Sequence, residues 1–96
     1  MIINFVPQRR DDVLSVSVRG DAITLNGVEL DFSPLEEGAT LPASAVDNEF
    51  VVGDVERVDG DIEITILLPH GANPSQEVAF PKPIVVAVDG DVELPQ

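Results

Sequence analysis

With 96 residues, 44% of them apolar, the chain can form one domain with a modest core, and it is too apolar for a disordered tail. It has no cysteine, which excludes disulfides, thiolate zinc sites and a cysteine nucleophile. Eighteen acidic residues against five basic ones give a net charge of −13, so the chain lacks the basic surface that nucleic acids and anionic membranes require.

Valine, isoleucine and leucine must build the core, because the aromatic residues are four phenylalanines, and this composition favours strands. The first predicted strand covers residues 2–6 and stops at Pro7, which has no N–H to donate. Residues 13–19 alternate apolar and polar side chains, which is the pattern of a half-buried strand. Gly20-Asp21 ends this strand.

A hairpin is predicted over residues 22–32. Its turn is Asn26-Gly27, a dipeptide that readily adopts the two positive φ angles of a type I′ turn. A turn of two residues brings apolar side chains opposite apolar ones: Leu25 faces Val28, and Ile23 faces Leu30.

Two single helical turns are predicted in the connection that follows. In residues 33–38, Ser33 can cap the turn, Pro34 suits the first helical position and Gly38 ends it. Residues 41–46 can form a second turn. This connection carries the chain from one sheet to the other, or across the end of a barrel.

The longest regular stretch is a second hairpin over residues 55–68. Its turn is Asp59-Gly60, and Gly53-Asp54 before it bends the strand or forms a bulge. In the second strand, apolar side chains recur at every other position and therefore share one face. These candidates for the core are Ile62, Ile64, Ile66 and Leu68.

The last third of the chain is rich in turn-forming residues. Residues 69–75 are predicted to be irregular, residues 77–80 to form a short edge strand, and residues 84–88 to form a strand that turns at Asp89-Gly90 into a final strand, as in a hairpin. About eight short strands joined by tight turns predict a single all-β domain over residues 1–96. The expected fold is a small antiparallel β-sandwich or barrel built from hairpins, with one or two single helical turns.

The turns at Gly60 and Gly90 share the pattern Asp-Gly-Asp-x-Glu, which could offer three carboxylates to calcium. Calcium takes about six to eight oxygen ligands, and neither stretch continues with further ligands. Hairpin turns explain the same residues, so no metal or other cofactor is predicted. The weak metal candidates are Asp59, Asp61, Glu63, Asp89, Asp91 and Glu93.

Catalysis that needs an imidazole would have to use His70, the only histidine. It lies between Pro69 and Gly71, where a loop histidine or a side chain that braces the loop backbone is the simpler interpretation. No serine lies in a Gly-x-Ser-x-Gly elbow, and the sequence has no His-x-x-x-His pair. We therefore predict no enzymatic activity and no catalytic residue.

Residues 84–88 are apolar at every position, so both faces of this strand need burial. Two interpretations remain open. The strand can lie in the centre of a sandwich with Ala87 facing a loop, or it can pair or pack with another chain. Pro81, Pro83 and Pro95 around it limit uncontrolled pairing. The candidate interface residues are Ile84, Val85, Val86, Ala87 and Val88.

The charge of −13 also has two interpretations. It can keep a monomer soluble through self-repulsion, or it can serve the binding of a basic partner or of cations.

Five stretches, in their order and spacing, resemble a family of short uncharacterised proteins encoded among the tail genes of phages and prophages of α-proteobacteria. They are residues 2–5, 38–42, 54–60, 67–73 and 80–84. The resemblance covers most of the chain. It implies a virion component or a tail-assembly accessory, and it carries over no catalytic or binding residue.

The expected function is therefore that of a non-enzymatic phage tail-associated protein, structural or active in assembly, that acts through protein–protein interaction. Its partners would be further copies of itself or other tail proteins. A calcium-stabilised acidic β-module is the alternative. Residues 1–7 lack the features of a secretory signal peptide, and no run is long enough to span a bilayer. We expect the protein in the cytoplasm of the bacterial host or in the virion.

Overall fold

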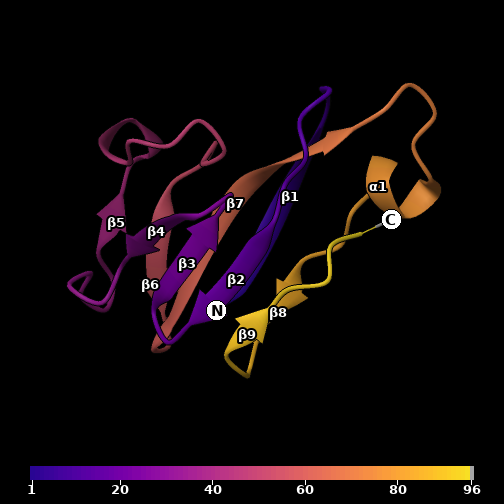
Figure 1. Cartoon of the computed structure of the whole chain (residues 1–96). Helices are drawn as coiled ribbons and strands as arrows, with labels where there is room; N and C mark the ends of the chain where they lie inside the picture. The colour runs from indigo at the N-terminus through magenta and orange to yellow at the C-terminus, as the bar shows by residue number, and fades with distance from the viewer. Residues whose placement is uncertain (96) are drawn as a thin grey trace.

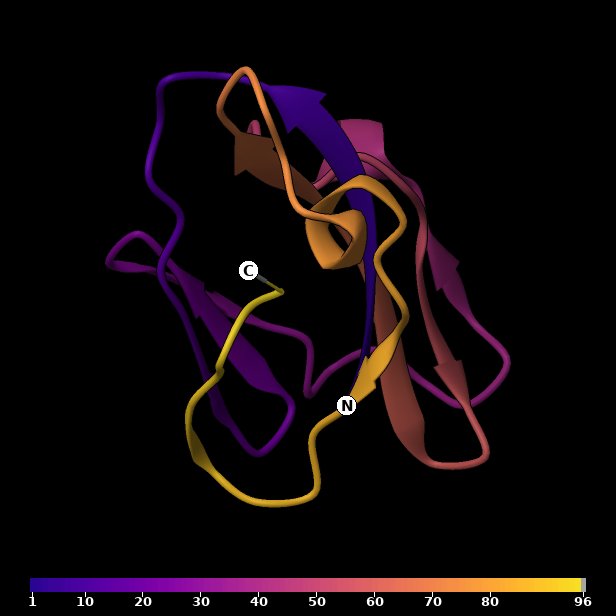
Figure 2. The same cartoon turned by 90° about the vertical axis from the view of Figure 1, so that its right-hand side faces the viewer.

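Two β-sheets face each other in the computed structural model, which describes residues 1–95 (Figures 1 and 2). One sheet has the strand order β5-β6-β7-β1-β8, and the other has the order β4-β3-β2-β9. The first sheet comprises β1 (Ile2–Arg9), β5 (Thr40–Leu41), β6 (Val55–Val58), β7 (Asp61–His70) and β8 (Ile84–Val85). The second comprises β2 (Val16–Arg19), β3 (Ala22–Leu25), β4 (Val28–Asp31) and β9 (Gly90–Asp91). The predicted all-β class is confirmed.

Strand β7 lies at the centre of the five-stranded sheet, between β6 and β1. It follows a two-residue turn in which Asp59 and Gly60 have φ angles of 51° and 84°, so both are positive as a type I′ turn requires. The alternate side chains predicted for the core are indeed buried on one face of this strand. They are Ile62, Ile64, Ile66 and Leu68, each 3% exposed or less.

The predicted hairpin of β3 and β4 is also confirmed. Leu25 pairs with Val28 and Ile23 with Leu30, and the φ angles of Asn26 and Gly27 are both positive. Strand β4 lies at the edge of its sheet, however, and Val28 is exposed.

Strand β1 does not stop at Pro7. It runs to Arg9 and pairs with β7 in parallel along its whole length, which makes this pair an exception in a mostly antiparallel fold. Successive backbone groups of a strand point to alternate sides: Met1 bonds to Val86 on the β8 side, and Arg10 donates to His70 on the β7 side. Pro7 therefore faces the β8 side, beyond the end of β8, where its missing N–H costs no ladder bond.

The predicted bulge before β6 is present. Val51 lies opposite Ile66, and Glu56 lies opposite Glu63. The segment from Val51 to Glu56, which contains Gly53-Asp54, is therefore two residues longer than the segment of β7 that it faces. A Cβ atom on Gly53 would lie 2.9 Å from the Cβ atom of Thr65, which explains why glycine occupies this position.

The helical turns differ in part from expectation. A 3-10 turn (η1, Ala43–Ala45) forms where the second one was predicted, whereas residues 33–38 form only hydrogen-bonded turns. The edge strand predicted over residues 77–80 is wrong, because this segment is a single helical turn, α1 (Gln76–Ala79). Ser75 caps it: its Oγ accepts a hydrogen bond from the backbone N–H of Val78 at 3.3 Å.

The hairpin predicted at Asp89-Gly90 is also wrong, because β8 and β9 belong to different sheets and the chain between them crosses from one sheet to the other (Figure 2). Gly90 pairs with Val18, and its φ of 137° favours glycine. The Asp89 carboxylate accepts a hydrogen bond from the backbone N–H of Gly20 at 2.8 Å. This turn thus binds another turn instead of folding back on β8.

Side chains from both sheets form one apolar cluster. Its most deeply buried members are Ile3, Ile23, Leu25, Val55, Ile62, Ile64 and Ile66.

Arg57 of β6 connects the two sheets. Its guanidinium donates to the carboxylate of Asp21, in the turn between β2 and β3, at 2.9 Å. It also donates to the carbonyl oxygens of Leu35, Phe32 and Gly60. The side chain is only 13% exposed, so these acceptors replace most of the water that the guanidinium would otherwise bind.

Candidate protein interface at strand β8

Strand β8 lies at one end of the five-stranded sheet and pairs only with β1 among the described residues 1–95. Figure 2 shows it beside β1, with α1 above it and the crossover to β9 below. The interpretation of residues 84–88 as a central sandwich strand is therefore wrong. A strand at an edge presents one row of backbone groups to its surroundings.

The register of β8 on β1 fixes which backbone groups are free. Val86 donates its N–H to the carbonyl oxygen of Met1 at 2.8 Å, and the amino group of Met1 donates to the carbonyl oxygen of Val86 at 3.0 Å. Ile2 and Val85 are the next pair along the ladder. Because hydrogen-bonded and non-bonded pairs alternate in antiparallel strands, the N–H and C=O groups of Val85 point away from β1, toward the open edge.

The side chains of residues 84–88 divide between the core and the surface. Ile84 and Val86 are half-buried and pack against the apolar cluster. The side chains of Val85 and Val88 are exposed, at 70% and 79%, together with Ala87. Phe80, just after α1, is 75% exposed. Exposed apolar side chains therefore lie on β8 and on the chain segments just before and after it.

A groove of about 720 Å³ lies on the side of β8 that Ile84 faces. Its walls come from α1, the stretch before β8 and the end of the chain, and it has two carboxylates and one ammonium group. The lining residues are Gln76, Glu77, Phe80, Lys82, Pro83, Ile84, Glu93, Leu94 and Pro95. The sequence leaves open whether residues 84–88 form a central strand or contact another chain. It does not predict the groove, because it predicts a strand where α1 forms. Ser75 was the available signal, as a capping serine ahead of Gln76-Glu77.

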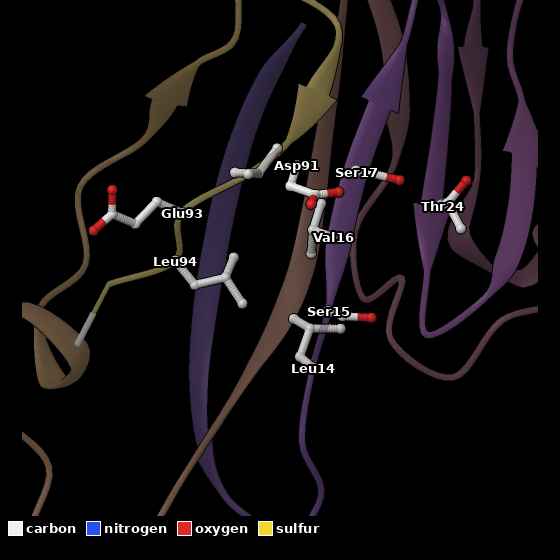
Figure 3. Close-up of a pocket in the computed structure, with 9 residues that line it drawn as sticks. Leu14, Ser15, Val16, Ser17, Thr24, Asp91, Glu93 and Leu94 are labelled. Carbon is white, nitrogen blue, oxygen red and sulfur yellow. The ribbon is translucent and has the colours of Figure 1, made fainter.

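A smaller hollow of about 400 Å³ lies between β2 and the stretch after β9 (Figure 3). Ser15, Ser17 and Thr24 contribute hydroxyl groups to it, and Asp91 and Glu93 contribute carboxylates. Figure 3 shows the Glu93 carboxylate on the opposite side from the hydroxyls of Ser17 and Thr24. The Asp91 carboxylate lies on the Ser17 side in the same view, so the polar groups of the hollow are divided between its two sides.

Two of the acidic residues proposed as metal ligands accept hydrogen bonds from other parts of the chain. The Glu63 carboxylate accepts a hydrogen bond from the side-chain amide of Asn4 at 2.9 Å, and Asp89 accepts from Gly20 as described. Asp59 lies within its turn, while Asp61, Asp91 and Glu93 are exposed. Within residues 1–95, no three histidine, aspartate or glutamate side chains lie together in a way that could hold a metal ion.

His70 is the last residue of β7 and is half-buried. Its Nδ1 atom lies 2.7 Å from the carbonyl oxygen of Gly71. A carbonyl oxygen can only accept, so Nδ1 carries the proton in this contact. This position agrees with the interpretation of His70 as a brace for the loop backbone.

Comparisons with protein-family models, with curated proteins and with solved structures find no match to this chain. Between residues 1 and 95 no helix has the length and apolar character needed to cross a membrane.

Proposed function

We propose that this chain is a non-enzymatic protein-interaction domain of a phage tail, structural or active in tail assembly, and that it binds its partner through residues 84–88. The observation that carries the proposal is the open edge of β8, with Val85 exposed on it and Val88 exposed three residues further along the chain. The resemblance to proteins encoded among tail genes supplies the phage context.

The apolar edge needs an explanation because soluble proteins usually protect their edge strands. Charged side chains, bulges or covering loops keep such strands from pairing with other chains. In a domain with a net charge of −13, residues 84–88 contain no charged side chain at all. An uncharged and apolar edge of this kind is typical of a surface that a partner covers.

The test measures the protein in purified phage particles and tail intermediates by quantitative mass spectrometry. The phage or prophage should carry Val85→Asp together with Val88→Asp, because carboxylates at these positions cannot be buried in a protein interface without a large cost. We expect the double variant to be lost from the particles or from the intermediates. Val28→Asp, an exposed valine on the β4 edge, is the matched control and should be incorporated normally.

Two results would contradict the proposal. Absence of the unmodified protein from both particles and intermediates removes the phage role. Normal incorporation of the double variant removes residues 84–88 as the interface.

A further inference from the structure

We infer that the partner adds a strand to the open edge of β8 and that this added strand is basic. The inference rests on the proposed function and deepens it, since it gives the mode of binding and the chemistry of the partner. Three observations carry it: the direction of the backbone groups of β8, the groove beside the strand and the charge of the domain.

The backbone of β8 is ready to extend the sheet. Val85 points both its N–H and its C=O away from β1, and no described residue bonds to either group. Pro83, two residues earlier, has no N–H to offer on the same side. An incoming strand can therefore form both backbone hydrogen bonds with Val85, but it finds no N–H donor at Pro83. This difference limits the register in which it can pair.

The groove beside β8 can receive side chains of the added strand. Successive residues of a strand point to opposite faces, so every second side chain would lie on the side of Ile84, where the groove opens. Phe80 and Leu94 offer apolar contact there, and Glu77 and Glu93 contribute two negative charges against the single positive charge of Lys82. The groove thus fits apolar and basic side chains.

The overall charge decides between a second copy and a different partner. Two copies, each with a net charge of −13, repel one another when their edges approach. A basic strand is attracted by the same field, which also raises its rate of association. The occupant of the β8 edge is therefore a basic extended segment of another protein.

The test uses two synthetic peptides of about ten residues as probes, one alternating lysine with valine and the other alternating glutamate with valine. Binding is measured by NMR titration and amide hydrogen exchange on the full chain. We expect the basic peptide to bind and to slow exchange at the amide of Val85. Binding of the acidic peptide should be at least about tenfold weaker.

Val85→Pro is the decisive variant, because it removes the outward N–H and leaves the pair between Met1 and Val86 in place. We expect it to weaken binding of the basic peptide about tenfold or more. Continued protection of the Val86 amide shows that β8 is still docked in this variant. Glu29→Pro is the matched control. The backbone of Val28 bonds to Leu25, so the backbone N–H of Glu29, the next residue, points outward from the β4 edge. Loss of this N–H should change binding of the basic peptide by less than about twofold.

Several outcomes overturn the inference. They are no binding of the basic peptide, no protection at Val85, or equal binding by Val85→Pro with Val86 still protected. Sedimentation that shows a dimer, abolished by Val85→Pro, would identify a second copy as the occupant and overturn the basic partner. If Val85→Asp with Val88→Asp blocks incorporation into particles while Val85→Pro does not, the proposed function stands and strand addition alone is wrong.

Discussion

Strands β7 and β8 belong to the same sheet and are both rich in aliphatic residues, yet they are buried to very different extents. β7 has neighbours on both sides and buries one complete face, from Ile62 to Leu68. β8 has a single neighbour and leaves Val85 exposed. An unbroken apolar run therefore does not imply a central strand. In this chain, the strand with alternating polar positions is the central one, and the fully apolar run forms the edge.

Truncating a core side chain should destabilise the domain much more in β7 than in β8. Ile64→Ala in β7 should lower the free energy of unfolding by about 3 kcal/mol, because it leaves a cavity at a fully buried position. Ile84→Ala in β8 should cost about 1 kcal/mol, since its side chain is only half-buried. Denaturant unfolding measures both. Equal losses would show that β8 is as much part of the core as β7.

The second prediction concerns Arg57 of β6, the neighbour of β7. Arg57→Ala should destabilise the fold by about 2 kcal/mol, because the Arg57 side chain is only 13% exposed, and the Asp21 carboxylate and the Phe32 carbonyl oxygen lose a donor at part-buried contacts. Arg19→Ala, at an exposed position, is the control and should change stability by less than about 0.5 kcal/mol. Thermal unfolding of the two variants side by side is sufficient, and similar melting temperatures would show that Arg57 does not join the sheets.

The bulge beside β7 gives the third prediction. Gly53→Ala should cost about 1–2 kcal/mol, because the added Cβ atom would come within 2.9 Å of Thr65 in the neighbouring strand. Gly71→Ala is the matched substitution, since nothing lies within 4 Å of its added Cβ atom, and it should be nearly neutral. Denaturation midpoints provide the measurement. A neutral Gly53→Ala would mean that the bulge is free to shift away from β7.

The fourth prediction sharpens the contrast on the β8 side. Val85→Asp should change the free energy of unfolding by no more than about 0.5 kcal/mol, because this side chain is exposed and makes no contribution to the core. Equilibrium unfolding in urea tests this directly. A loss of several kcal/mol would show that Val85 stabilises the fold. Absence of the Val85→Asp, Val88→Asp variant from particles could then no longer be assigned to a lost interface.

The smallest effect concerns the other sheet edge, where β4 has charged residues in place of the apolar ones of β8. The backbone N–H of Ser33 bonds to Asp31 and holds the pKa of this carboxyl below its usual value of 3.8. The ionised Asp31 carboxylate therefore stabilises the folded state above pH 3.8, and this contribution is lost as the pH falls through the lowered pKa of the folded state. Asp31→Asn should reduce this part of the acid sensitivity, as measured by unfolding midpoints between neutral pH and about pH 2. An unchanged acid profile would contradict it.

Local turn chemistry made a large part of the fold predictable. Asn26-Gly27 and Asp59-Gly60 specify type I′ turns through their own φ preferences, and the alternation around them sets the register. The parallel pairing of β1 with β7 has no such local signal, because the two strands meet only through the tertiary fold. Pro7 is consequently typical of a strand end in the sequence, although among residues 1–95 no strand pairs with it on the side that it faces.

The candidate site was predictable only in its apolar strand. The apolar run over residues 84–88 leaves two placements open, a central strand or a strand that contacts another chain. The partner of β8 in the sheet is β1, at the start of the chain, which no pattern near residue 84 reveals. The groove depends on α1, whose single turn is set by Ser75 and is too short for helical periodicity to appear. The place of β8 in its sheet and the groove beside it depend on contacts between residues far apart in the sequence, so local patterns do not predict them.

The parallel pairing of β1 with β7 also orders events during synthesis. Ile2 has Glu63 opposite it, so the first strand leaves the ribosome well before its partner exists. At about 5–20 residues per second, this apolar strand stays unpaired for seconds. Strands β2, β3 and β4 can assemble during that interval, because each pairs with a neighbour in sequence. A chaperone that shields this apolar strand while it is unpaired would therefore raise the yield of folded protein.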